Sequence, residues 1–229
     1  MPNINLKGLR KRSRVLVLVW LVFLLSLVAC LPQETLEARP EKPLEALELE
    51  FPATWHSYRA TPFKLSLPET WQVLSMTSAL SAFSASLPKG VLLLASLPQD
   101  KSNLSGIVFL NEDVPLLSSL DKYSELSLHN LQSSIESLSQ LRYRFVELPI
   151  GKVTEIRYTA LRYDAEGIGH ELHHWQYLLL RKGKGYVLQC AMAEDLFAKD
   201  ILEFDNLNTQ GLDNESLCLH IAASLSYEP

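Results

Sequence analysis

Residues 170–174 (His-Glu-Leu-His-His) form the segment whose residue types and spacing are best suited to chemistry. They fit the pattern H-E-x-x-H, in which two histidines one helical turn apart hold Zn²⁺ while the glutamate polarises a water molecule. Here the segment continues into an apolar run and a Gly-Lys-Gly turn, which indicates a strand. In a strand His170 and His174 share a face but lie about 13 Å apart, so no single metal ion can bind both. We therefore expect ordinary strand histidines and no metal, with adventitious or structural metal binding by His170, His173 and His174 as an alternative.

A helical interpretation of this segment stays open, because the apolar residues between 172 and 179 also fit a period of 3.6 residues. A zinc hydrolase with His170 and His174 as ligands would need a third ligand, and nothing singles out Glu194 or Glu203 for that role. A metal-dependent envelope hydrolase that uses this cluster is thus the alternative function. We predict no catalytic residue elsewhere, since the sequence has no G-x-S-x-G elbow and no Gly-rich phosphate loop.

The start of the chain has the order of features of an export signal. A basic stretch that ends at Arg14 is followed by an apolar run over residues 15–29, which is short for a bilayer span of about 20 residues. Leu27-Val28-Ala29-Cys30 then resembles the lipobox of bacterial lipoproteins, in which a small residue precedes a lipidated cysteine. The resemblance implies that residues 1–29 are a signal peptide, and that Cys30 becomes the lipid-modified N-terminus. An uncleaved anchor helix and simple secretion are the alternatives.

A lipidated Cys30 would make the membrane the first partner of the protein, because two or more acyl chains anchor stably where one does not. The covalent lipid is then the only cofactor that we expect. Residue 31 is Leu rather than the Asp that retains lipoproteins at the inner membrane of enteric bacteria. This favours the cell envelope at the outer membrane, facing the periplasm, if the source has two membranes.

The charge of the chain is unevenly distributed. All 5 basic residues before position 30 lie in the first 14 positions, where there is no acidic residue, so the rest of the chain has a net charge of about −10 rather than the overall −5. A body this acidic lacks the basic face that phosphate contacts require. We therefore expect no nucleic acid among the partners.

Cys190 and Cys218 are the two cysteines that follow Cys30. An oxidising compartment permits a disulfide, and a terminal helix packed on a sheet could bring the two Cα atoms to the required distance of about 4.4 to 6.8 Å. Two buried thiols that act as small apolar residues are the other possibility. The sequence leaves both open.

The mature chain divides into a spacer and one domain. Residues 30–50 are rich in glutamate and are interrupted by three prolines, a composition that cannot bury a face and predicts a flexible linker. A short packed helix from Leu44 to Phe51 is the alternative. From residue 51 to residue 229 short apolar runs predict a single α+β domain.

Periodicity predicts the elements of this domain. Residues 118–140 read as the one long helix, with an apolar stripe and a capping box at Ser118 and Asp121. Residues 195–204 and 214–226 predict a short helix and a terminal helix. Lys182-Gly183-Lys184-Gly185 predicts a hairpin turn. The predicted strands cover 63–67, 71–74, 83–87, 91–95, 106–110, 143–148, 152–163, 170–181 and 186–193.

The opening Phe63-Lys-Leu-Ser-Leu-Pro-Glu-Thr-Trp71, the late Gly183-Lys-Gly-Tyr-Val-Leu188 and the terminal helix resemble the PsbP-like superfamily, which includes bacterial lipoproteins of the DcrB kind. The resemblance implies a central antiparallel sheet with the long helix and the C-terminal helix packed on it. The family has no shared catalytic motif, and its members mostly act as binding or assembly modules. We therefore expect a lipid-anchored, non-catalytic binding or assembly module with an unknown envelope protein or small ligand as partner. A mainly structural lipoprotein is a further possibility.

Overall fold

The computed structural model describes residues 38–44, 54–75, 89–97, 104–114, 119–164, 166–193 and 213–228. The predicted signal peptide, Cys30, the strand over 83–87 and the helix over 195–204 lie outside these residues. In the described part of the chain, no helix is long and apolar enough to cross a membrane.

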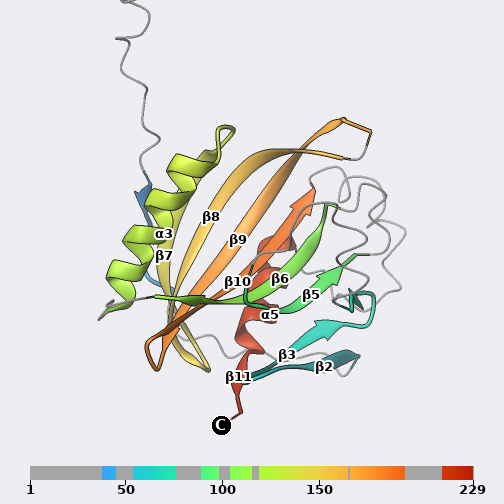
Figure 1. Ribbon diagram of the computed structural model, residues 1–229, viewed down its shortest axis with the longest axis vertical. Helices are drawn as coiled ribbons and strands as arrows, with labels where there is room; N and C mark the ends of the chain where they lie inside the picture. Colours follow the sequence, from blue (N-terminus) through green and yellow to red (C-terminus); the bar gives the residue numbers. More distant parts are fainter. Residues whose placement is uncertain are drawn as a thin grey trace, which may run out of the picture. The chain divides into compact units, whose positions relative to one another are not determined.

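An eight-stranded sheet forms the centre of the described structure (Figure 1). Its strand order is β1-β7-β8-β9-β10-β6-β5-β4, and every neighbouring pair is antiparallel except β1 with β7. The strands are β1 (Arg39–Pro40), β4 (Gln72–Val73), β5 (Val91–Ser96), β6 (Gly106–Asp113), β7 (Ser139–Leu148), β8 (Gly151–Tyr163), β9 (Gly169–Arg181) and β10 (Lys184–Ala193).

A smaller sheet has the order β11-β3-β2, with β2 (Trp55–Ala60), β3 (Phe63–Pro68) and β11 (Ser226–Tyr227). The predicted strands near residues 63–67 and 71–74 are close in the sequence but belong to different sheets. β3 pairs with β2 in the small sheet, whereas β4 pairs with β5 in the large one. The predicted turn after β9 is confirmed: Lys182 and Gly183 both have positive φ, as a two-residue type I′ turn requires.

The helix α3 (Leu120–Ser134) packs on one face of the large sheet. It begins at Ser119, whose hydroxyl accepts a hydrogen bond from the Lys122 amide at 3.3 Å, so the cap is one residue later than predicted. It also ends earlier than residue 140, because Ile135 is extended and β7 begins at Ser139. The buried cluster on this face, here called the α3 face, contains Val114, Tyr123, Leu128, Leu141, Ile156, Tyr158, Ala160, Leu178 and Val187.

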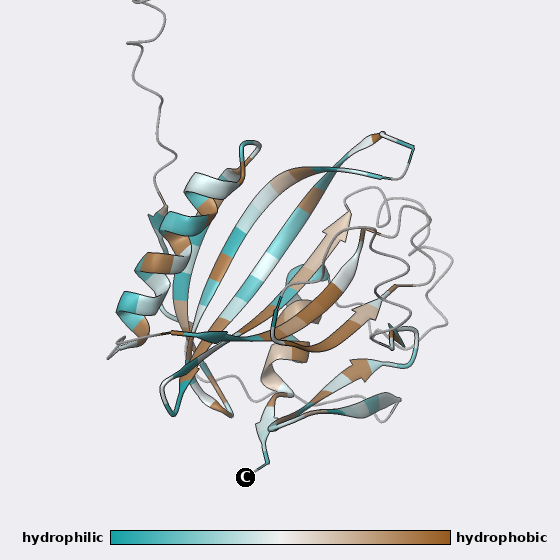
Figure 2. Ribbon diagram, viewed as in Figure 1, coloured by the Kyte–Doolittle hydropathy of each residue, from teal (hydrophilic) through white to brown (hydrophobic). Residues whose placement is uncertain are grey.

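The helix α5 (Asn214–Ala223) packs on the opposite face, here called the α5 face. Alternate residues of β9 establish this, since Leu178 belongs to the α3-face cluster while Tyr177 and Leu179 belong to the other. Figure 2 shows the alternation of hydrophilic and hydrophobic residues along β8 and β9. α5 also contacts β3, so the helix is enclosed by both sheets. The predicted fold class, α+β with both helices packed on an antiparallel sheet, is confirmed.

The described part of the predicted linker is hydrogen-bonded to the edge of the large sheet. In residues 38–44, here called the edge segment, the Glu41 amide donates to the Tyr143 carbonyl at 2.8 Å and the Leu44 amide donates to the Phe145 carbonyl at 2.9 Å. Backbone hydrogen bonds to β7 hold this stretch, and its Ala38 and Leu44 pack against the buried clusters of the domain. The composition of residues 30–50 thus did not reveal that part of the stretch adds a strand.

Candidate functional site

The histidine cluster lies in β9, where its side chains alternate between the two faces of the sheet. The helix that an H-E-x-x-H zinc site needs is therefore not formed by these residues. In the part of the chain that the structure describes, no group of three or more His, Cys, Asp or Glu residues could hold a metal ion. The alternative of a hydrolase built on His170 and His174 loses its geometric basis.

His170 fixes the turn between β8 and β9. Its Nε2 lies 2.8 Å from Asp164 Oδ2, and Asp164 Oδ1 accepts hydrogen bonds from the amides of Glu166 and Ile168 at 3.1 and 2.8 Å. The hydrogen bond with His170 lowers the pKa of Asp164. His170 therefore acts with Asp164 to order a hairpin tip.

His174 belongs to a neutral polar chain on the α3 face. Its ring stacks on Tyr158 with centroids 4.6 Å apart, and Gln189 Nε2 donates to its Nδ1 at 3.0 Å. Gln176 donates to the Tyr158 hydroxyl and to Gln189 at 3.2 and 3.3 Å. Burial lowers the pKa of His174 to about 3. The imidazole is thus neutral at physiological pH.

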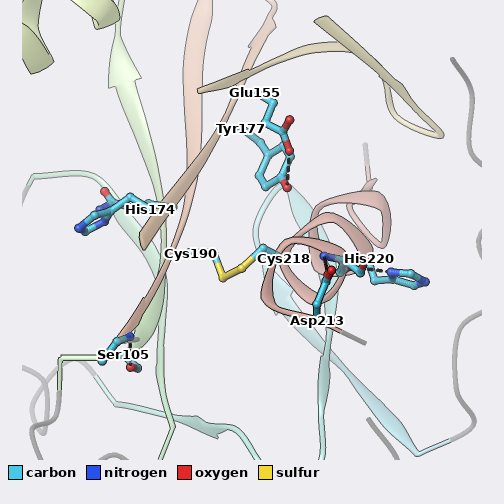
Figure 3. The surroundings of a disulfide bond; sticks show 11 residues. Ser105, Glu155, His174, Tyr177, Cys190, Asp213, Cys218 and His220 are labelled. Carbon is cyan, nitrogen blue, oxygen red and sulfur yellow. Dashed lines mark hydrogen bonds between the residues drawn. A yellow bond between two sulfur atoms is a disulfide. The ribbon is translucent and has the colours of Figure 1, made fainter. Parts of the chain in front are cut away.

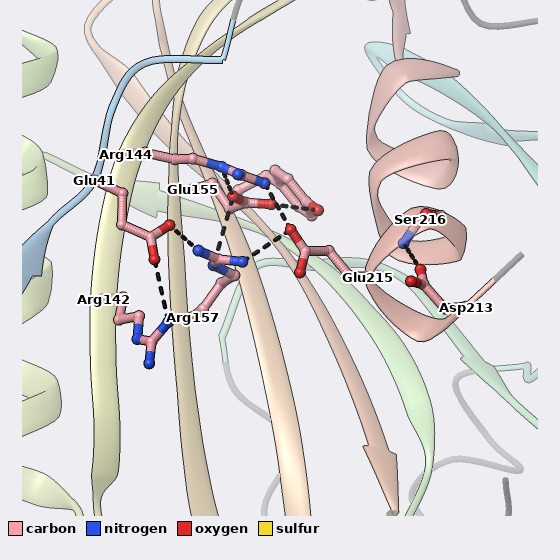
Figure 4. Close-up of polar contacts among 9 residues, drawn as sticks. Glu41, Arg142, Arg144, Glu155, Arg157, Asp213, Glu215 and Ser216 are labelled. Atoms are coloured by element: carbon pink, nitrogen blue, oxygen red, sulfur yellow. Dashed lines mark hydrogen bonds and ion pairs between the residues drawn. The ribbon is translucent and has the colours of Figure 1, made fainter.

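The α5 face carries a network of three arginines and three glutamates where β7, β8, the edge segment and the start of α5 meet (Figure 4). Glu215 Oε1 contacts Arg144 Nη2 at 2.9 Å and Arg157 Nη1 at 2.8 Å. Glu41 contacts Arg157, and its Oε1 lies 3.4 Å from Arg142 Nη1. Formal charges therefore balance within the network.

Glu155 is the innermost member of the network, with no exposed surface. It contacts Arg144, and the Tyr177 hydroxyl donates to its Oε1 at 3.0 Å. Burial raises the pKa of Glu155 against the opposing effect of Arg144. Burial likewise raises the pKa of Tyr177, with Glu155 adding to the effect, so Tyr177 keeps its proton and acts as a donor. This pairing fixes Arg144 in the sheet.

Arg142 and Arg157 lie directly opposite one another on β7 and β8. Like charges in such a cross-strand pair are destabilising. The carboxylates of Glu41 and Glu215 lower this repulsion from two sides. Glu155 Oε2 lies 3.9 Å from Arg157 Nε as a third anion. The pair therefore needs anions, and one of the three that it has comes from the edge segment.

A pocket of about 170 Å³ adjoins this arginine pair. Adjacent pairs in the strand register build its wall, because Arg142 is opposite Arg157, Arg157 is opposite Trp175, and Thr159 is opposite His173. His173 Nδ1 lies 3.5 Å from Thr159 Oγ1. The lining residues are Gln140, Arg142, Arg157, Tyr158, Thr159, His173, His174, Trp175 and Glu215. Guanidinium, hydroxyl, amide and imidazole groups thus converge on a cavity large enough for a small polar group.

The sequence analysis predicted none of the arginines as site residues. Arg142 and Arg144 alternate with Leu141 and Tyr143 along the strand. This alternation is the one signal in the sequence that the two charges share one face of a strand whose other face is buried. Arg157 is 15 residues beyond Arg142, and only the register of β7 and β8 brings them together.

A disulfide joins Cys190 of β10 to Cys218 of α5 (Figure 3). The two Cα atoms are 6.0 Å apart, and both residues are buried in the α5-face cluster. Of the two arrangements that the sequence left open, the structure contains the bonded one. The bond fixes the helix that presents Glu215 to the arginines.

The described residues thus define an α+β domain with a polar pocket between the sheet and the start of one helix. No family model matches the chain, and no curated protein matches it. Similar solved structures include a cyanobacterial PsbP (CyanoP) from Synechocystis, with 15% identity, a TM-score of 0.47 and coverage of 77% of this chain and 94% of that chain. A variant of the protein Mog1 has 8% identity and a TM-score of 0.45, covering 76% of this chain and 95% of that chain.

A protein of Bacteroides thetaiotaomicron has 10% identity and a TM-score of 0.41, and the match covers 77% of this chain and 48% of that chain. A PsbP, from the superfamily that the sequence resembles, is thus among the similar structures. At these identities and TM-scores we base no conclusion about family or function on the similarities.

Proposed function

We propose that this protein is a lipid-anchored protein of the cell envelope that acts as a non-catalytic binding module, with the pocket beside Arg142 and Arg157 as its binding site. The observation that carries the proposal is the convergence of polar groups from three neighbouring strands and α5 on one cavity. Such a cavity with a few convergent polar groups is the usual form of a ligand site.

The location in the envelope is supported by two independent features. The basic start, the apolar run and Leu27-Val28-Ala29-Cys30 follow the order of a lipoprotein signal. The disulfide between Cys190 and Cys218 is typical of a protein that folds in an oxidising compartment. Because residue 31 is Leu, we further propose residence at the outer membrane, facing the periplasm, in a source with two membranes.

Metabolic labelling with a radioactive fatty acid tests the anchor. Wild-type protein should be labelled and partition into detergent, whereas Cys30→Ser should be unlabelled and remain an uncleaved precursor. Leu31→Asp is the matched variant, because it keeps the cysteine and should be labelled while moving to the inner membrane. Normal processing and detergent partitioning of Cys30→Ser would contradict the anchor.

Photo-crosslinking in cells tests the binding site. A benzophenone side chain at position 140, where the exposed Gln140 lines the pocket, keeps both arginines and should give adducts with whatever occupies the pocket. The same side chain at Glu125, exposed on α3, serves as the control. Adducts specific to position 140 support the proposal. No adduct at position 140, or the same adducts at both positions, would contradict it.

A further inference from the structure

Glu41 occupies the arginine pair as an internal ligand. Its carboxylate contacts Arg142 and Arg157 at once, from a segment that lies 101 residues before Arg142 in the sequence. The pocket itself is lined by the two arginines but not by Glu41. A carboxylate is thus already bound to the two arginines that line the candidate site.

The edge segment that presents Glu41 is a short strand at the edge of the sheet, with Ala38 and Leu44 packed against the buried clusters. β1 has two residues, pairs with β7 alone, and lies at the edge of the sheet. Besides the amides of Glu41 and Leu44, the described backbone contacts of this stretch include the Glu147 amide donating to the Leu44 carbonyl at 3.3 Å. Arg39 and Pro40 are exposed. Short edge strands with exposed hydrogen bonds are among the first parts of a protein to open.

We propose that the pocket binds a carboxylate group of a ligand, which takes the place of Glu41 on Arg142 and Arg157, and that this exchange releases residues 38–44 from β7. The inference rests on the proposed function and names its ligand class. Arginine matches carboxylates with its planar fork of donors, and Glu41 already uses this chemistry here.

A carboxylate fits this site better than a phosphate. Glu215 remains bound to Arg157 and lines the pocket, so an incoming dianion would meet a fixed negative charge. A single carboxylate replaces the charge of Glu41 without adding to it. A free organic acid and the acidic side chain of a peptide both supply this group, and the experiment below separates them.

Release would lengthen the connection to the anchor. Ala38 follows Cys30 by 8 positions, which at about 3.3 to 3.6 Å per residue reach at most about 29 Å. With the edge segment released, the 14 positions from Cys30 to Leu44 could reach about 50 Å. Ligand binding would thus change how far the domain extends from the membrane.

Calorimetric titration of the purified full chain in detergent tests the exchange, with propionate and an end-blocked peptide that contains one glutamate as the probes. The probe that binds is called the accepted probe. Glu41→Gln removes the internal competitor and should tighten binding of the accepted probe about tenfold, because we expect Glu41 to occupy the two arginines for about nine-tenths of the time. Glu125→Gln on α3 changes the net charge equally and should leave the affinity as it is. Arg157→Gln should weaken binding at least tenfold. If that variant does not fold, Arg142→Gln at the exposed rim replaces it.

Hydrogen exchange tests the release. The amides of Glu41 and Leu44 should exchange faster when the protein is saturated with the accepted probe, and already without probe in Glu41→Gln. Binding of propionate or of the peptide supports the inference and identifies the source of the carboxylate. Unchanged exchange on saturation, equal affinity in Glu41→Gln, or binding that survives both arginine substitutions would overturn it.

A third probe separates the inference from the proposed function. Inorganic phosphate that binds in an Arg157-dependent manner, while neither carboxylate binds, would overturn the ligand class and leave the pocket as a binding site. Absence of crosslinked adducts at position 140 would instead remove the proposed function itself.

Discussion

The polar residues on the two faces of the large sheet have different kinds of partners, although the same strands supply both faces. On the α5 face, the arginines of β7 and β8 pair with Glu155 of β8 and with glutamates from two other segments. On the α3 face, Tyr158, Gln176, His174 and Gln189 form a neutral chain. The charges on the α5 face thus depend on partners from outside the two strands, whereas the hydrogen bonds of the neutral chain join residues of the sheet strands alone.

The two helices also differ, in how much of their surface is buried. α5 is enclosed by two sheets and has buried residues on most of its circumference, whereas α3 buries Tyr123, Ser124 and Leu128. An enclosed helix cannot present many charges, so the acidic residue in the first turn of α5, Glu215, has a specific partner in the arginine network. We therefore expect substitutions on the α5 side to lower the free energy of unfolding more than substitutions on the α3 side.

Core truncations should show the largest difference. Ile221→Ala in α5 removes a side chain with no exposed surface, so we expect a loss of about 4 kcal/mol in the free energy of unfolding, near the upper end of such substitutions. Leu128→Ala in α3, at 8% exposure beside solvent, should cost about 2 kcal/mol. Urea denaturation measures both. Equal losses would remove the distinction between the helices.

Loss of the disulfide should give the second-largest decrease in the free energy of unfolding. The double substitution Cys190→Ala and Cys218→Ala opens a loop of 28 residues, which should lower the free energy of unfolding by about 3 kcal/mol. Adding a reductant to the wild-type protein is the corresponding treatment and should give a similar loss. A protein equally stable in both states would show that α5 is held by packing alone.

The neutral chain on the α3 face should make stability depend on pH. The pKa of His174 is about 3 in the folded protein and near 6.5 when unfolded, so the unfolded chain binds more protons between these values and stability falls as the pH drops below 6.5. From pH 7 to pH 5 His174 should account for a loss of about 2 kcal/mol. Denaturation of His174→Gln should show a correspondingly smaller loss over this range.

The exposed His129 on α3 provides the control for that measurement. His129→Gln should retain the full pH dependence of the wild-type protein. If His174→Gln retains it as well, the imidazole of His174 is not the buried neutral group described above.

Substitutions of the helix-capping residues should have the smallest effect on the free energy of unfolding. Asp213 Oδ1 accepts from the Ser216 amide at 2.7 Å, and this bonding lowers the pKa of Asp213. Asp213→Ala should cost about 1 kcal/mol at neutral pH. Because the folded pKa is lowered, this stabilisation is complete above the unfolded pKa of about 3.8 and disappears as the pH falls through the folded value. Ser119→Ala, at the cap of α3, should have a similar cost that does not change with pH, because serine does not titrate.

Much of the sheet could be predicted from the sequence, because apolar alternation and a Gly-containing turn specify β9 and β10 locally. The end of α3 was predicted too late, since Leu138 continues the apolar spacing although the chain has already left the helix at Ser134. Ser226 was assigned to the terminal helix for a similar reason, but it lies in β11 and pairs with Lys64 of β3. In each case a distant partner decided the local structure.

The candidate site could not be predicted in the same way. Its arginines come from two strands and its glutamates from β8, α5 and the edge segment, so the set exists only after the strands have found their register. The placement of Glu41 was further hidden by a glutamate- and proline-rich composition that is typical of linkers. Long-range pairing of charges leaves no periodic pattern in a sequence.

The intact mass of the protein purified from its native membrane, measured with and without reduction, tests the central claim most directly. We predict a mass equal to residues 30–229 plus acyl chains, which rises by two hydrogen atoms on reduction of the Cys190–Cys218 bond. A mass equal to the unprocessed chain, or to a processed chain without lipid, would contradict a lipid-anchored binding module in the cell envelope.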